Sequence, residues 1–272
     1  MIVQHNMTAL NANRQLGITN TNLARSTEKL SSGYRVNRAA DDAAGLSISE
    51  KMRGQIRGLE QASTNAEDGQ SLIQTAEGAL SEIHSVLQRM RELTVQASND
   101  TNVSADRKAI AKEVRALTSE INRIATQTQF NTMGLLSGGF KNKKLQVGAN
   151  TNQTISITIS SMTAGKLGVS ATVIAKVISS STGKDITKLI TTVNTAITKV
   201  STQRSALGAL QNRLDHTIAN ADNMAENLQS SESKIRDVDM ADEMVSYSAS
   251  SILQQAGQSM LAQANQATQG VL

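Results

Sequence analysis

Side chains that could carry out chemistry are few in this sequence, and they lie far apart. The histidines are His5, His84 and His216, and there is no cysteine, which excludes disulfides and thiolate metal sites. An adjacent carboxylate pair, Asp41-Asp42, lies beside a break in the helical pattern, where a negative charge at the start of a helix explains it better than acid–base catalysis does. We therefore predict that the protein is not an enzyme and has no metal site and no cofactor.

The composition favours long helices. The 272 residues include no proline and no tryptophan, and aromatic residues make up 1%. Interior proline costs a helix about 3 kcal/mol, so its absence suits uninterrupted helices. A net charge of +4 and so few aromatic residues do not indicate a nucleic-acid partner. No apolar run is long enough to cross a membrane, and the first residues lack the pattern of a cleaved signal peptide.

One stretch, residues 68–97, requires partner helices along its whole length. Its apolar residues recur at alternating steps of three and four, the spacing of a heptad stripe. A second row beside this stripe, at Leu72, Ala79, Val86 and Leu93, widens the buried face. We call the main stripe the rod seam; its members are Ile73, Ala76, Leu80, Ile83, Leu87, Met90, Thr94 and Ala97.

The rest of the chain supplies the partners. We predict helices over about 43–98, 104–128 and 185–233, the second folding back on the first. Alternating residues in 144–148 and 154–159 predict a β-hairpin. Residues 160–184 are rich in serine, threonine and glycine, and we interpret them as a small surface-exposed insertion. The predicted fold is mainly α, a long antiparallel coiled-coil rod with paired N- and C-terminal helices and a small β-hairpin insertion.

The two ends of the chain carry almost no charge. Residues 1–13 and 244–272 contain no Asp, Glu, Lys or Arg. Each end nevertheless has an apolar stripe at helical spacing, and an uncharged helix of this kind is poorly stable alone. We predict that both ends become ordered on self-assembly, with Leu23, Leu30, Ile252 and Met260 as contact residues. The C-terminal stripe consists of Val245, Ala249, Ile252, Ala256, Met260 and Ala264.

Several long motifs resemble bacterial flagellin, in the order in which that family carries them. The N-terminal motifs are LSSGYRVNRAADDAAGLSISEKMRGQIRGL (30–59), SLIQTAEGALSEIHSVLQRMRELTVQA (71–97) and QTQFNTMGLLSG (127–138). The C-terminal motifs are LGALQNRLDHTIAN (207–220), ESKIRDVDMADEM (232–244) and SMLAQANQ (259–266). The resemblance covers roughly residues 1–150 and 190–272, which is far more specific than a single short pattern.

The resemblance implies a structural subunit that polymerises into the flagellar filament for swimming. It places terminal helices 1–42 and 234–272 in an inner tube and residues 43–233 in a rod domain, with the β-hairpin and a short variable insertion at about 140–184. It implies a short form without large outer domains. The subunit would lie outside the cell, exported through the flagellar secretion channel without a cleaved signal peptide.

The resemblance also implies partners. These are an export chaperone that binds the C-terminal tail, the filament cap, and an innate immune receptor of the host, Toll-like receptor 5. Leu87 lies on the rod seam and should pack internally, whereas Arg89, Leu93 and Glu113 lie off their seams and should face a partner. The receptor-binding residues of the family match Leu87, Gln88, Arg89, Leu93, Gln96, Ile110 and Glu113.

Two other functions fit parts of the pattern. A hook–filament junction protein would share the terminal motifs but would join a polymer instead of elongating it. A coiled-coil adaptor outside the flagellum would explain the heptads but not the uncharged ends.

Overall fold

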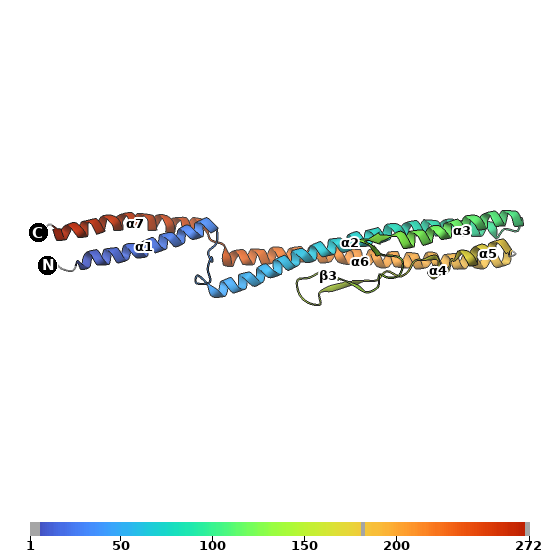
Figure 1. Ribbon diagram of the computed structural model, residues 1–272, viewed down its shortest axis with the longest axis horizontal. Coiled ribbons are helices and arrows are strands. Elements are labelled where there is room, and N and C mark those ends of the chain that lie inside the picture. The colour runs from blue at the N-terminus through green and yellow to red at the C-terminus, as the bar shows by residue number, and fades with distance from the viewer. Residues whose placement is uncertain (1–5, 181–182, 270–272) are drawn as a thin grey trace. The chain divides into compact units, whose positions relative to one another are not determined.

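Long helices make up most of the computed structural model, which describes residues 6–180 and 183–269 (Figure 1). The chain divides into two compact units. The terminal unit combines the segment up to Ile56 with the segment from Glu226 onward, and the central unit consists of residues 57–225. Both units are mainly helical, and the described strands form only two-stranded sheets, so the predicted fold class is confirmed.

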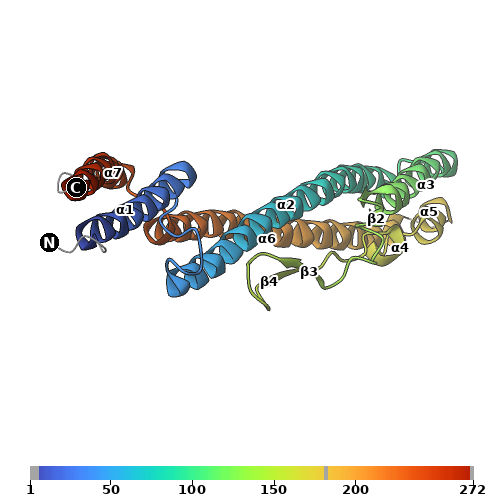
Figure 2. The same cartoon turned by 60° about the vertical axis from the view of Figure 1, so that its left-hand side comes forward.

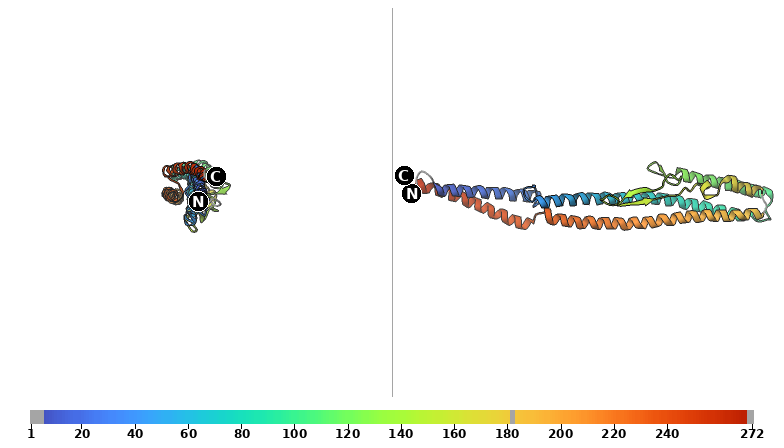
Figure 3. Two further views of the ribbon diagram at one scale, coloured as in Figure 1. Left: turned by 90° about the vertical axis from the view of Figure 1, so that its left-hand side faces the viewer. Right: turned by 90° about the horizontal axis from the view of Figure 1, so that it is seen from below.

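The terminal unit is built on two helices from opposite ends of the sequence. Helix α1 (Met7–Ser32) lies antiparallel against α7 (Met240–Gln269), as Figure 3 shows in blue and red. The Asn6 side chain accepts a hydrogen bond from the Ala9 N–H at 3.1 Å and caps the start of α1. Gly33, with φ of 74°, ends the helix in the left-handed conformation that glycine adopts without strain.

The central unit contains most of helix α2 (Ala43–Ala97) and most of α6 (Gly183–Arg236). Helix α3 (Ser104–Gln127) folds back on α2, as predicted, and Arg107 Nε donates to the Ala97 carbonyl at 3.2 Å across the turn. All eight residues of the rod seam are buried, and Leu80 and Ile83 are 0% exposed. The heptad spacing therefore identified the core of this unit.

Two small hairpins follow α3 (Figure 2). The predicted one is confirmed, with β3 (Lys143–Gln146) antiparallel to β4 (Thr154–Ile157). Alternate residues Ile155 and Ile157 enter the core, because side chains of a strand point to opposite faces. An unpredicted two-residue pair, β1 (Gln129–Phe130) and β2 (Met133–Gly134), closes a tight turn.

The segment after β4 is not the surface-exposed insertion that we predicted. It forms α4 (Ala164–Leu167) and α5 (Ala171–Ser180), and α5 packs against α3. Leu167, Ile174 and Ile178 are at most 2% exposed. The serine- and glycine-rich composition hid short apolar spacings, which become a buried face only because α3 lies beside them.

Helix α6 carries a buried polar side chain, Gln203, which is 9% exposed. The Gln203 amide accepts from the Ser160 N–H and donates to the Thr158 carbonyl, each at 3.3 Å. It therefore satisfies backbone groups just after β4, which a single-helix pattern could not reveal.

Candidate assembly surface

The contact between α1 and α7 is a heptad seam that combines small residues with leucines and a few longer polar side chains. Leu16, Leu23 and Leu30 are its large members in α1, and Ser26 between them is 7% exposed. The rest of the half-buried seam is Ala9, Ala12 and Thr19 in α1 and Glu243, Tyr247, Ser250, Gln254, Gly257, Leu261 and Ala264 in α7. Small side chains let the two helix backbones approach closely, as their dense packing requires.

Polar contacts fix how α1 and α7 align. Gln254 Nε2 donates to Asn20 Oδ1 at 2.8 Å near the middle of the pair. Lys29 forms an ion pair with Glu243 at 3.5 Å at one end. Beyond the Gln254–Asn20 contact, toward the two ends of the chain, a Cβ on Gly257 would lie 3.3 Å from Leu16 Cδ1, so the glycine makes room for that leucine. A shift of one residue would break all three contacts.

The faces of α1 and α7 that point away from this seam expose large apolar side chains. Val245 is 70% exposed and Ile252 67%, and both belong to the predicted C-terminal stripe. That stripe therefore points outward, and within one chain only Ala264 at its end joins the seam. The other exposed apolar side chains on the pair are Met7, Leu10, Ile18, Met240, Met244, Leu253 and Met260. We call this set, with Val245 and Ile252, the outer terminal surface.

The four predicted contact residues separate into two kinds. Leu23 and Leu30 are half-buried in the seam with α7, so they hold the helix pair together. Ile252 and Met260, at 67% and 61% exposed, lie mostly in water. The apolar residues Ile2 and Val3 at the N-terminal end lie outside the described residues.

A cluster around Arg236, which sequence reasoning missed, joins the other parts of the terminal unit. Its guanidinium donates to Glu50 Oε1 at 2.8 Å and lies 4.9 Å from the centre of the Tyr34 ring. A short backbone bridge runs beside it, with the Arg35 N–H donating to the Arg236 carbonyl at 2.7 Å. The predicted pair Asp41-Asp42 serves the same loop: Asp42 Oδ1 accepts from the Gly45 N–H at 2.8 Å and caps α2, as its interpretation as a helix-start charge requires.

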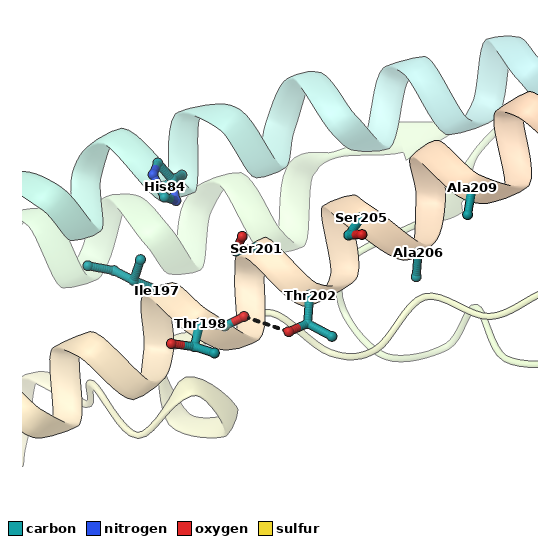
Figure 4. A pocket seen from close by; sticks show the side chains of 8 residues that line it. All are labelled: His84, Ile197, Thr198, Ser201, Thr202, Ser205, Ala206 and Ala209. Carbon is teal, nitrogen blue, oxygen red and sulfur yellow. Dashed lines mark hydrogen bonds between the residues drawn. The ribbon is translucent and has the colours of Figure 1, made fainter.

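A groove between α2 and α6 in the central unit is lined by His84 of α2 and by residues of α6 (Figure 4). His84 Nε2 lies 3.4 Å from the Gln88 amide. The Thr198 and Thr202 hydroxyls donate to carbonyls of their own helix at 3.0 and 2.9 Å. In the described structure no hydrogen bond joins His84 to a groove hydroxyl, the contact that a nucleophile and its base would need.

The residues matched to receptor binding lie on the α2–α3 side of the central unit, but they do not form one exposed set. Arg89, Gln96 and Glu113 are exposed, and Gln88 is half-buried. Leu87 and Ile110 are buried, at 0% and 8% exposed. Leu93 corrects our expectation: it is 2% exposed, because the second row beside the rod seam faces the core. The prediction that Leu93 faces a partner is therefore wrong for the free chain.

Two family models match this chain, on either side of its middle. The model described as the bacterial flagellin N-terminal helical region matches residues 3–141, and the bacterial flagellin C-terminal helical region matches residues 190–272. The chain belongs to the bacterial flagellin family. It is a short flagellin, and as such a structural subunit of the flagellar filament.

The sequences of several relatives match this flagellin over nearly their full length. A flagellin from Halalkalibacterium halodurans is 53% identical over 278 residues, covering 100% of this chain and 98% of the relative. A flagellin from Bacillus subtilis is 48% identical, covering 100% and 99%. A flagellar filament 33 kDa core protein from Treponema phagedenis is 49% identical with the same coverage, 100% and 99%.

Solved structures of a flagellin and of a hook-associated protein both resemble this chain. The crystal structure of Bacillus cereus flagellin is 30% identical, with a TM-score of 0.50, and covers 61% of this chain and 94% of that one. A putative flagellar hook-associated protein from Vibrio parahaemolyticus has a TM-score of 0.63 but only 12% identity, covering 72% and 100%. That second likeness shows a shared fold alone, so the filament subunit, and not the junction protein or the adaptor, is the function that the relatives support.

Two further observations on the described residues concern membrane spans and metal sites. No helix among them is both long enough and apolar enough to pass through a membrane. Within residues 6–180 and 183–269, no three metal-ligating side chains gather where they could hold an ion.

Proposed function

We propose that the outer terminal surface is where neighbouring subunits meet inside the filament. The observation that carries this proposal is the exposure of Ile252 and Met260, at 67% and 61%, on a helix with no charged side chain beyond Glu243. Fully burying such a side chain contributes about 1.5–3 kcal/mol. The seam residues Leu23 and Leu30 would act indirectly, by keeping α1 and α7 paired.

Substitutions on this surface test the proposal. Ile252→Asp and Met260→Asp should leave the helicity and melting temperature of the free subunit unchanged, because both side chains already lie in water. Elongation from added filament seeds, followed by electron microscopy, should stop. Val103→Asp is the matched control, since Val103 is 61% exposed in the central unit and precedes α3, where an aspartate is favoured. Normal elongation of both surface variants would refute the proposal.

We also propose that the ends and the middle of the chain form different parts of the filament. Residues 1–42 and 234–272 form the inner tube, and residues 43–233 form the rod. The Arg236 cluster supports a boundary near these positions, because it ties the α1–α2 loop to the end of α6. Hydrogen exchange before and after polymerisation would test the division. Protection should increase most within α1 and α7, and least along the rod seam, which is already buried.

We propose export without a cleaved signal peptide, through the flagellar secretion channel, with an export chaperone on the C-terminal tail. The exposed apolar side chains of α7 support this partner, since a chaperone would cover a surface that is otherwise left to water. Changing Val245, Ile252 and Leu253 together to serine should abolish chaperone binding measured by calorimetry. The filament cap, which promotes insertion at the growing end, completes the expected partners, and no catalytic role is proposed.

We propose recognition by Toll-like receptor 5 through the exposed polar residues of the α2–α3 face. Arg89 and Glu113 support it, because an arginine beside a carboxylate offers oriented donors and acceptors to a partner. Leu87, Leu93 and Ile110 would support the face from beneath. Binding of the purified subunit to the receptor ectodomain, compared with variants of Arg89, tests this proposal independently of filament formation.

A further inference from the structure

The outer terminal surface exposes methionine, the one apolar residue type on it that mild oxidants attack. Met7 is 68% exposed in α1, and Met240, Met244 and Met260 are 48%, 48% and 61% exposed in α7. We infer that these four residues are oxidation sites that control assembly. A free subunit in which they are oxidised to sulfoxides would not add to the filament. The inference rests on the proposed role of this surface in subunit contact.

The chemistry needs a hydroperoxide as the oxidant. The thioether sulfur attacks one peroxide oxygen, an S–O bond forms as the O–O bond breaks, and the remaining oxygen leaves as water. Sulfur loses two electrons and the peroxide gains them, so thioether plus hydrogen peroxide gives sulfoxide plus water. The product replaces a flexible apolar side chain by a polar one. Reductase enzymes that act on methionine sulfoxide reverse the change.

The effect should depend on whether the surface is in water or buried. In the free subunit a sulfoxide on Met260 or Met244 stays solvated, so α1 and α7 remain paired. In a subunit contact the sulfoxide oxygen would be taken out of water among Ile252, Leu253 and Val245, which offer it no side-chain donor. A buried polar group without a partner opposes association, so oxidation should weaken assembly without unfolding the subunit.

Methionines outside this surface provide internal controls. Met90 and Met162 are 0% and 3% exposed, so they should react slowly in every state. Met133 and Met224, at 40% and 50% exposed, lie in the central unit and should react in the free subunit without affecting the terminal helices. The chain therefore contains protected, exposed and surface-contact methionines that one mass-spectrometric experiment can separate.

The first test is a peroxide footprint of free subunits and of finished filaments. We expect Met7, Met240, Met244 and Met260 to oxidise in the free subunit and to be protected in the filament. If they oxidise equally fast in both states, the surface is not buried, and the proposed function fails together with this inference. If they are protected, the proposed function stands and the second test decides the inference.

The second test measures the critical concentration for seeded elongation after peroxide treatment. Oxidation should raise it about tenfold or more in the wild type, and methionine sulfoxide reductase should restore it. The quadruple variant M7L/M240L/M244L/M260L should have the same critical concentration before and after peroxide, whatever its starting value, whereas the critical concentration of the control variant M133L/M224L should rise after peroxide as in the wild type. An unchanged critical concentration of the oxidised wild type, or a failure of the reductase to restore it, would overturn the inference without any variant.

Discussion

The guanidinium of Arg89 in α2 forms an ion pair with Glu113 in α3, which lies 24 residues further along the chain. Two of its nitrogens each lie 3.0 Å from the same carboxylate oxygen. Arg89 also reaches Glu92 at 3.0 Å on its own helix. The hydrogen bonds that Arg89 donates to Glu92 and Glu113 raise the pKa of Arg89 above its ordinary value. The pair presents a fixed charge pattern on the face matched to receptor binding.

A charge swap separates the two roles of this pair. Arg89→Glu alone should lower receptor affinity about tenfold, as loss of an arginine hot spot does. Adding Glu113→Arg restores the ion pair between α2 and α3, but it reverses the pattern that a receptor meets. We therefore expect the melting temperature to return to the wild-type value while the receptor affinity measured by surface plasmon resonance stays low. Recovery of receptor affinity in the double variant would show that Arg89 does not contact the receptor.

The rod seam should control the stability of the central unit. Leu80 is 0% exposed in its middle, so Leu80→Ala should lower the free energy of unfolding by about 2–5 kcal/mol. Leu80→Asp should abolish cooperative unfolding, because it also buries a charge. Glu82→Ala, two residues away on the exposed side of α2, should change it by about 0.5 kcal/mol or less. Urea denaturation followed by circular dichroism checks all three; equal effects at positions 80 and 82 would contradict the seam.

Two glycines of α2 should respond oppositely to the same substitution. A Cβ on Gly58 would lie 2.8 Å from Ala149 Cβ in the β3–β4 loop, whereas nothing lies within 4 Å of a Cβ on Gly78. Gly78→Ala should stabilise the helix by about 0.5–1 kcal/mol. Gly58→Ala should lose that gain by pushing the loop away, which hydrogen exchange over residues 143–157 would detect. The idea fails if both variants are stabilised alike with an undisturbed hairpin.

The α1–α2 loop should loosen in acid through Asp41. Its carboxylate accepts from the Arg38 N–H at 2.9 Å and the Asn37 N–H at 3.2 Å. The hydrogen bond from the Arg38 N–H is the main cause that lowers the pKa of Asp41 below its usual value, followed by the hydrogen bond from the Asn37 N–H and the positive charges of Lys29 and Arg25. Because the folded-state pKa is depressed, the stabilisation is complete above the unfolded value of about 3.9 and is lost as the pH falls through the lower folded value.

An NMR titration of the Arg38 amide checks the role of Asp41. Its chemical shift should move below a pH of about 3.9 in the wild type and stay flat in Asp41→Asn. Asp100→Asn, in the turn before α3, provides a control that should leave the Arg38 titration unchanged. A wild-type shift that persists in Asp41→Asn would assign the acid response to another group.

The heptad pattern predicted the central unit well because its core is made of large apolar residues. Ile73, Leu80 and Met90 recur at a spacing that only a buried helix stripe explains, and the structure buries each of them. The same logic located Ile155 and Ile157 in a strand by their alternation. It failed for Ile174 and its neighbours, whose short apolar spacing was hidden among serine and threonine.

The terminal unit shows the limit of that reasoning. The sequence by itself determined that both ends are helical, uncharged and apolar on one side, because spacing and composition are local properties. Only the tertiary structure decided which side meets the partner helix: the leucines of α1 pack against a face of α7 that includes Gln254 and Gly257, while Val245 and Ile252 are left outside. Small polar side chains carry no hydrophobic signal, yet they allow the closest approach of two helices. The close approach of two segments more than 200 residues apart in sequence therefore fixed the inner seam and left the apolar stripe of α7 facing outward.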